Sequence, residues 1–191
     1  MGEKRLLAIL GSPHKNGKVA SMLWMAMDYA KEKGYKITLV DLYDLSAGYC
    51  KGCMSCRKTG RCVLEDDMCG LGEKMEKSDV IILAYPTYFA NVPAIVKNMF
   101  DRLSGTVMKE NDKGQLKPRM KQGKKYALLV SCNTPAPFHI LFQQSSRAVK
   151  ASEEFFKMAG FKQLGNVVMP NSRKLKGISE PVRKKIGGLL Q

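Results

Sequence analysis

Long apolar runs are absent from this sequence. Its most apolar segments, Leu6 to Leu10 and Val80 to Ala84, have only the length of a buried strand. The N-terminal residues lead directly into the first of these segments, without the longer apolar stretch and small-residue cleavage site of a signal peptide. We therefore expect no membrane-spanning helix, and we predict a cytoplasmic protein.

Acidic residues are also scarce. The 191 residues include 32 Lys and Arg against 17 Asp and Glu, which gives a net charge of +15. Residues 109–125 hold seven basic and two acidic residues, and residues 171–191 hold six and one. Neither segment interleaves aromatic residues as a nucleic-acid stacking surface would, so nucleic acid is not the expected partner. The charge fits either a plain solvated surface or steering of an acidic redox partner such as a small ferredoxin.

Histidine is nearly absent, whereas cysteine is concentrated in one place. The chain has two histidines, and His139 has no second histidine near it, so we expect it in a loop or at a cap rather than on a metal. Four of the six cysteines fall within thirteen residues, with two successive two-residue gaps and then a five-residue gap: Cys50, Cys53, Cys56 and Cys62. Bacterial ferredoxins also begin their cluster motif with two such gaps. The spacing predicts a four-thiolate site, with an iron–sulfur cluster as the favoured occupant.

Two other uses of these cysteines stay open. A structural zinc ion could take the same ligands, although zinc usually binds two separated Cys-x-x-Cys pairs. The cysteines could also be empty thiols, or oxidised pairs formed after loss of a cluster. Structural disulfides are not expected, because nothing in the sequence indicates secretion.

A strand, a polar turn and a helix follow one another at the start of the chain. Arg5 to Leu10 reads as a strand, and residues 19–30 keep one apolar face at helical spacing. The turn between them, residues 11–19, matches neither the Walker A pattern nor the Gly-x-Gly-x-x-Gly dinucleotide pattern. A helix N-terminus after such a turn still attracts anions, because free N–H groups and the helix dipole converge there. We therefore predict a phosphate site of another kind.

The remaining pattern predicts an α/β protein with a flavodoxin-like, doubly wound, five-stranded parallel sheet in the order 2-1-3-4-5. Further strands are expected at residues 36–42, 79–84, 126–130 and 161–169, and a long helix at residues 140–159. Residues 104–123 read as a long surface connection. We expect one domain, residues 1–191, with a cysteine-rich insertion at about 46–70 and a basic C-terminal helix. The turns after the first, third and fourth strands would then share the ligand-binding edge.

Three stretches resemble a known family. Gly11 to Gly17 resembles the phosphate loop of the NADPH-dependent FMN reductase superfamily. Tyr85 to Phe89, followed by Lys97 and Asp101-Arg102, resembles its flavin-ring loop and the next helix. Within this superfamily, the cysteine spacing and the following Asp66-Asp67-Met68 resemble the cluster motif of the iron–sulfur flavoproteins. The similarity extends over about residues 4–170.

The resemblance implies bound FMN, a 4Fe–4S cluster, and a homodimer or a dimer of dimers. The expected FMN-binding residues come from three turns: Ser12, His14, Asn16, Gly17, Lys18 and Val19; Pro86, Thr87, Tyr88, Phe89 and Asn91; and Ser131 and Asn133. The expected cluster ligands are Cys50, Cys53, Cys56 and Cys62. The family loop usually continues Gly-Asn-Thr where this chain has Gly17-Lys18-Val19, which removes a hydroxyl donor and adds a cation.

These observations favour an electron-transfer oxidoreductase in which FMN is coupled to a 4Fe–4S cluster, with the electron donor and acceptor drawn from NAD(P)H, ferredoxin, quinones and oxygen species. The cofactors would supply the chemistry, so no side chain is nominated as catalytic. One alternative is a plain NAD(P)H-dependent FMN or quinone reductase without a cluster. Another is a zinc-stapled basic binding protein, for which salt-sensitive DNA binding by a colourless protein would be the sign.

Overall fold

A five-stranded parallel sheet forms the centre of the molecule, in the order β2-β1-β3-β6-β7. The computed structural model describes residues 3–190. The strands are β1 (Arg5–Leu10), β2 (Lys36–Asp41), β3 (Val80–Pro86), β6 (Lys125–Ser131) and β7 (Lys162–Met169). Since β3, β6 and β7 are the third, fourth and fifth strands of this sheet, the predicted flavodoxin-like order is confirmed.

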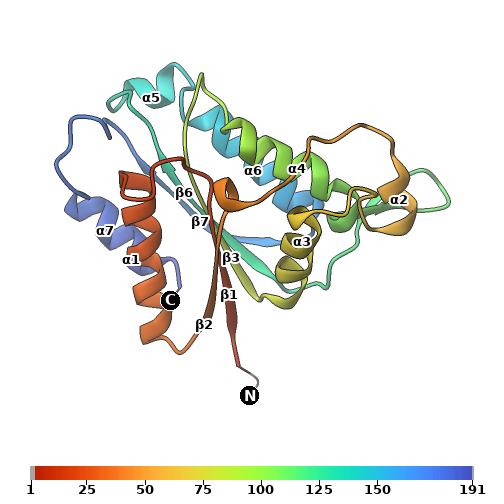
Figure 1. Ribbon diagram of the computed structural model, residues 1–191. Helices are drawn as coiled ribbons and strands as arrows, with labels where there is room; N and C mark the ends of the chain where they lie inside the picture. Colours follow the sequence, from red (N-terminus) through yellow and green to blue (C-terminus); the bar gives the residue numbers. More distant parts are fainter. Residues whose placement is uncertain (1–2, 191) are drawn as a thin grey trace.

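Helices cover both faces of the sheet (Figure 1). Helices α1 (Lys18–Glu32) and α7 (Glu180–Gly188) pack on one face, and α3 (Asp67–Lys77), α4 (Ala94–Val107) and α6 (Ser146–Met158) pack on the other. The central strands β1, β3 and β6 are therefore buried along nearly their whole length. This explains why they read as continuous apolar runs rather than as alternating ones.

The carboxyl ends of the central strands lie side by side, at the top of the view in Figure 1. The Gly11 amide donates to the Ala84 carbonyl (2.7 Å), and the Thr87 amide donates to the Ser131 carbonyl (2.9 Å). These two bonds join the segments that leave β1, β3 and β6. A side chain at Gly11 would overlap the Val96 side chain of α4, so only glycine lets the first turn pass this helix.

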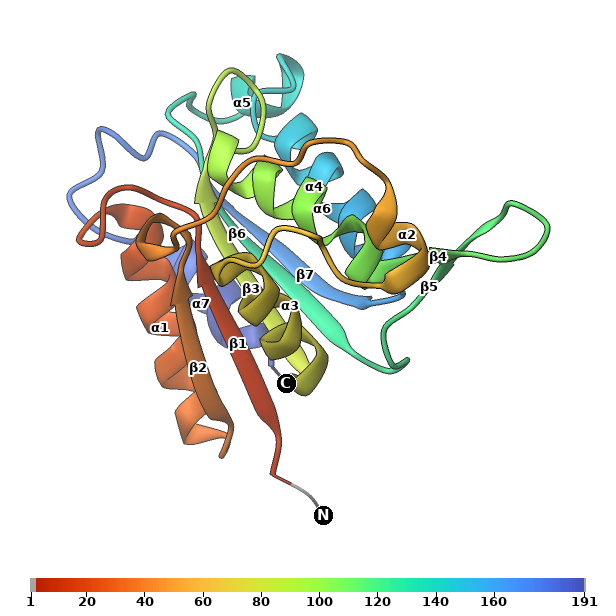
Figure 2. The same ribbon diagram turned by 45° about the vertical axis from the view of Figure 1, so that its right-hand side comes forward.

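Residues 104–123 are more regular than predicted. Helix α4 continues through Val107, and a two-stranded antiparallel ribbon follows, made of β4 (Met108–Glu110) and β5 (Leu116–Pro118). The Asn111 side chain fixes its turn by accepting from the amides of Lys113 (3.1 Å) and Gln115 (2.9 Å). The ribbon projects from the body of the molecule beside the short helix α2 (Ser55–Thr59) (Figure 2). The long surface connection expected here therefore contains a ribbon that the sequence did not predict, because local asparagine turn chemistry outweighed the weak periodicity.

The prediction of a single helix over residues 140–159 is wrong. The structure has a short helix α5 (Phe138–Leu141) and then α6, separated by Gln143 with φ 54°. The Ser145 amide donates to the His139 carbonyl, and the Ser145 hydroxyl lies 2.8 Å from His139 Nδ1. These contacts hold the chain in a turn between the two helices. His139 is therefore a buried helix residue, neither in a loop nor at a cap.

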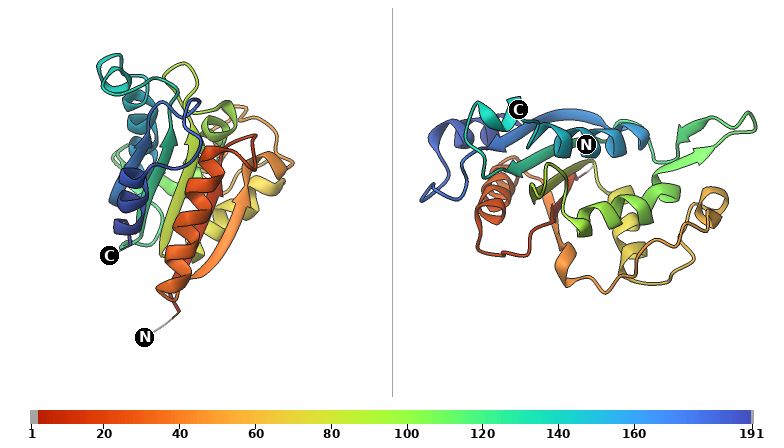
Figure 3. Two further views of the ribbon diagram at one scale, coloured as in Figure 1. Left: turned by 90° about the vertical axis from the view of Figure 1, so that its left-hand side faces the viewer. Right: turned by 90° about the horizontal axis from the view of Figure 1, so that it is seen from above.

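The chain continues from β2 into a short 3₁₀ helix and then into the cysteine-rich segment. Asp41 caps the 3₁₀ helix, η1 (Leu42–Asp44), through its contact with the Tyr43 amide. Seen from above, in the right-hand view of Figure 3, the cysteine-rich segment and the β4–β5 ribbon extend beyond the α/β core. Within residues 3–190, no helix combines the length and the apolarity needed to cross a membrane.

Candidate functional site

The phosphate loop, residues 11–19, ends at an uncapped helix. Gly17 is the N-cap residue of α1, and no side chain caps the helix there. The first-turn N–H groups of α1 therefore remain available to an anion, and the helix dipole adds to the attraction. The outer side of the loop faces an open cavity of about 580 Å³, which includes His14, Asn16 and Gly17. This geometry fits a bound phosphate group.

Three residues of this loop have side chains that are already buried or hydrogen-bonded within the protein. Ser12 is buried, and its hydroxyl accepts from the His14 amide (3.3 Å), so it shapes the turn. Val19 is buried in the core, which leaves its backbone N–H as its only contribution to an anion. The Lys18 ammonium donates to the Lys176 carbonyl (2.6 Å). Lys18 thus ties the start of α1 to the loop after β7, a contact that its sequence position did not reveal.

The ring loop, residues 86–91, is a tight turn with an exposed aromatic residue at its tip. Tyr88 and Asn91 exchange backbone hydrogen bonds of 3.0 and 2.9 Å. Phe89 and Ala90 between them have φ values of 49° and 59°, a conformation that costs energy for residues with a Cβ. The Phe89 side chain is fully exposed. A strained turn that presents an aromatic ring to solvent is suited to contact a flat ligand or a partner.

The third loop, residues 131–135, lies beside the ring loop. Ser131 is buried and accepts from the Thr87 amide, while the Asn133 side chain accepts from the Ser172 hydroxyl (2.9 Å). The structure therefore gathers all three predicted turns at one edge of the sheet. An uncapped helix start for a phosphate, with two loops beside it for a flat ring, fits FMN. The individual binding roles of these residues stay predictions.

The cysteine loop, residues 46–66, lies over α3 and α4. Cys50 and Cys53 are exposed, and Cys56 and Cys62 are half-buried. Hydrogen-bond donors point at several of the sulfurs. The Gly52 amide lies 3.5 Å from the sulfur of Cys50, and the amide of Ser55, helped by its hydroxyl, lowers the pKa of the Cys53 thiol. Donors of this kind favour thiolates, the form that binds metal.

The four sulfurs do not converge in this structure. Among the residues it describes, no three His, Cys, Asp or Glu side chains are close enough to hold a metal ion together. The residues nevertheless fit a thiolate-bound cluster by chemistry, since all four are free thiols and two of them, Cys50 and Cys62, receive hydrogen bonds. The cluster ligands predicted from the spacing stay a prediction.

An ion pair between the buried Arg102 and the partly buried Asp66 holds the cysteine loop against α4. The Arg102 guanidinium binds both carboxylate oxygens of Asp66, at 2.8 and 2.7 Å, in the parallel geometry of a strong pair. Asp66 also accepts from the amides of Gly48 and Met68, the latter as the N-cap of α3. The Arg102 contact lowers the pKa of Asp66, and the Asp66 contact raises the pKa of Arg102. Both groups therefore stay ionised.

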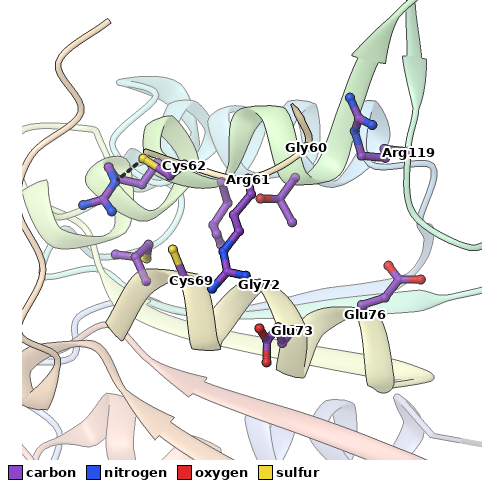
Figure 4. Close-up of a pocket in the computed structure, with 12 residues that line it drawn as sticks. Gly60, Arg61, Cys62, Cys69, Gly72, Glu73, Glu76 and Arg119 are labelled. Atoms are coloured by element: carbon purple, nitrogen blue, oxygen red, sulfur yellow. Dashed lines mark hydrogen bonds between the residues drawn. The ribbon is translucent and has the colours of Figure 1, made fainter. Parts of the chain in front are cut away.

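Sequence reasoning gave Asp66 and Arg102 no role of their own. The available signal was the position of Arg102 on the apolar side of α4, between Met99 and Leu103. An arginine on the buried face of a helix needs a carboxylate partner, and the structure identifies it. A cavity of about 340 Å³ between α3 and α4 was also missed; both Cys62 and Cys69 line it (Figure 4).

These features define the class of the protein: a flavodoxin-like α/β protein whose three predicted cofactor-binding turns meet at the carboxyl edge of its sheet. The sequence model of the NADPH-dependent FMN reductase family matches residues 4–138. The chain therefore belongs to that family.

The most similar curated proteins include two archaeal relatives. An iron-sulfur flavoprotein of Archaeoglobus fulgidus is 38% identical over 99 residues, which cover 52% of this chain and 45% of that protein. An iron-sulfur flavoprotein of Methanosarcina thermophila is 38% identical over 98 residues, covering 51% of each. The chain thus matches only about half the length of these relatives. They agree with the iron–sulfur branch that the cysteine motif indicated.

Solved structures show the same fold at low identity. An FMN-dependent NADH-azoreductase from Bacillus anthracis, in complex with FMN, superposes with a TM-score of 0.74 at 13% identity, covering 96% of both chains. An NAD(P)H:quinone oxidoreductase from Methanothermobacter marburgensis gives a TM-score of 0.71 at 14% identity, covering 99% of this chain and 93% of that one. At such identities the likeness concerns the fold alone.

Proposed function

We propose that this protein is an FMN-dependent oxidoreductase that transfers electrons between a flavin and a 4Fe–4S cluster held by the cysteine loop. The observation that supports coupling of two sites is the position of Asn98 on α4. Its side chain accepts from the Cys50 amide (3.3 Å) and donates to the Gly48 carbonyl (3.2 Å). Asn98 lies four residues after the start of α4, about 6 Å along the helix, and α4 itself follows the ring loop. One short helix segment therefore connects the flavin edge to the cysteine loop.

The chain's own residues would bind and orient rather than react. The N–H groups at the start of α1 would hold the FMN phosphate, and the ring loop and third loop would enclose the flat ring and exclude water. Cys50, Cys53, Cys56 and Cys62 would hold the cluster as thiolates. Bound FMN would supply two-electron chemistry, and the cluster one-electron chemistry, when both are present. No side chain is assigned as a general acid or base.

The family and the relatives support this function by name. The family description specifies NADPH-dependent FMN reductases, and the relatives above are called iron-sulfur flavoproteins. We extend this to NADPH or NADH as the hydride donor for this chain, with a quinone, an oxygen species or a ferredoxin as acceptor. The cysteine loop is what separates this proposal from a plain reductase.

A plain NAD(P)H-dependent FMN or quinone reductase is the second candidate, favoured by the separation of the four sulfurs within the described residues. An ultraviolet–visible spectrum of protein purified without oxygen, with iron and sulfide assayed on the same sample, decides between the two. Flavin bands with about four irons per chain support the coupled centres. Flavin bands without iron leave the plain reductase. A colourless protein would overturn both functions and point to the zinc-stapled binder.

We further propose that two copies associate at the carboxyl edge. Helix α5 and its flanks present four exposed apolar side chains there, Phe138, Ile140, Leu141 and Phe142. Exposed apolar groups gathered on one element are typical of a protein–protein contact. Sedimentation equilibrium should give a homodimer or a dimer of dimers, and changing Ile140 and Leu141 to serine should shift it toward monomer. A wild-type monomer at micromolar concentration would count against the proposal.

The basic surface supports an acidic redox partner. Arg57 and Lys58 of α2 lie beside the ribbon, whose strands carry Lys109 and Lys117. Electron transfer to a small acidic ferredoxin should therefore slow steeply as ionic strength rises, because screening weakens steering. Reaction with a neutral quinone is the control and should change little. Equal salt dependence with both would contradict the proposed steering.

A further inference from the structure

The Arg102 side chain makes more contacts than a simple ion pair requires. It is fully buried, and besides Asp66 it donates to the carbonyls of Gly48 (2.6 Å) and Leu64 (3.1 Å). Its Nε donates to the Cys62 sulfur at 3.2 Å, the dashed contact in Figure 4. One guanidinium thus joins the start of the cysteine loop, the end of the loop and a predicted cluster ligand.

This arrangement fixes Cys62 relative to α4. The Leu64 carbonyl that receives Arg102 Nη2 also accepts from the Cys69 thiol (3.3 Å), so the chain around Cys62 is held from two sides. Asp66 alone would neutralise the arginine, but the fork of the guanidinium directs its remaining N–H group at sulfur. Sulfur accepts a hydrogen bond weakly as a thiol and more strongly when it carries negative charge.

We propose that Arg102 is the positioning residue of the cysteine site, holding Cys62 in place and raising the reduction potential of the cluster that Cys62 binds. This inference rests on the proposed function. Reduction adds one negative charge to a cluster, and hydrogen bonds and positive charge at its sulfurs stabilise that charge. A lysine at this position could keep the charge but could not span Asp66, Leu64 and Cys62 together.

The test compares Arg102→Lys with Arg119→Lys as a matched control. Arg119 also binds backbone carbonyls in this region, those of Gly105 (2.9 Å) and Arg57 (2.8 Å), but no sulfur. In iron-loaded protein, redox titration followed by absorbance should show a more negative cluster potential for Arg102→Lys and an unchanged one for Arg119→Lys. An unchanged potential in Arg102→Lys would overturn the tuning role.

Asp66→Asn separates tuning from simple disruption. This isosteric change keeps the Arg102–Cys62 contact available and removes the negative charge that compensates Arg102, so it should shift the cluster potential in the positive direction. A purely structural role predicts shifts of the same sign in Asp66→Asn and Arg102→Lys, whereas the proposal predicts opposite signs. Potential shifts of the same sign in the two variants would therefore overturn the proposal. This criterion also holds if Arg102→Lys binds less iron than wild type.

A measurement on metal-free protein tests the positioning role of Arg102 separately from the proposed function. In metal-free protein, amide hydrogen exchange of residues 46–52 and 62–66 should accelerate at least about tenfold in Arg102→Lys, since hydrogen bonds to a charged group are lost. In Arg119→Lys the acceleration should be confined to residues 55–60. Wild-type protein that binds no iron would refute the cluster, while unchanged exchange in Arg102→Lys would refute the positioning role.

Discussion

Replacement of Asn16 by aspartate is expected to weaken FMN binding by about tenfold or more. Asn16 is exposed in the phosphate loop, directly before the uncapped N-cap Gly17 of α1, and aspartate has nearly the same shape. A second negative charge a few ångströms from a phosphate costs about 1–4 kcal/mol, depending on solvent screening, and roughly 1.4 kcal/mol corresponds to a factor of ten. Fluorescence titration of the apoprotein with FMN measures the change.

The control for this prediction carries the same charge change elsewhere. Asn111 lies in the turn of the β4–β5 ribbon, far along the chain from the phosphate loop, and Asn111→Asp keeps its acceptor oxygen for the Lys113 and Gln115 amides. Its FMN affinity should match that of wild type. The weakening in Asn16→Asp should also shrink at high salt, because exposed charges are screened. Equal affinities for Asn16→Asp and wild type would place the phosphate elsewhere.

The features that sequence predicted well are those that periodicity and chain order control. The apolar face of α1, with Val19, Met22 and Leu23, is buried as its spacing indicated. The continuous apolar strands are buried on both faces, and their order follows from the alternation of strands and helices. The three loops predicted to bind the cofactor could be placed together for the same reason, since parallel strands end at one edge of the sheet.

The features that sequence missed depend on side chains far apart in the chain. Arg102 and Asp66 are separated by 36 positions, and nothing local to either residue identifies the other. The break before α6 likewise depends on the contact of Ser145 with His139 and on the positive φ of Gln143. In both places a specific polar contact, which a hydrophobic pattern does not encode, determines the local structure.

Replacement of Gly105 by alanine is expected to remove most of the iron while FMN is retained. Gly105 lies in α4, and a Cβ there would overlap the backbone carbonyl of Cys56 in α2. Such overpacking costs about 1–3 kcal/mol unless an element moves. Helix α4 is held by its buried residues Met99, Phe100 and Leu103, whereas α2 has no buried residue. Helix α2 should therefore move away and take Cys56 out of position.

Helix propensity does not explain the expected loss of iron in Gly105→Ala, because alanine favours a helix over glycine by about 1 kcal/mol. Gly188→Ala is the matched control: Gly188 also lies in a helix, as the last residue of α7, and a Cβ there meets no heavy atom within 4 Å. It should leave both iron and flavin per chain at the wild-type values. The measurements are iron, sulfide and flavin assays on wild-type, Gly105→Ala and Gly188→Ala protein, each purified without oxygen. Full iron content in Gly105→Ala would show that Cys56 need not stay packed against α4, and loss of flavin together with iron would mean that the two sites are not structurally separable.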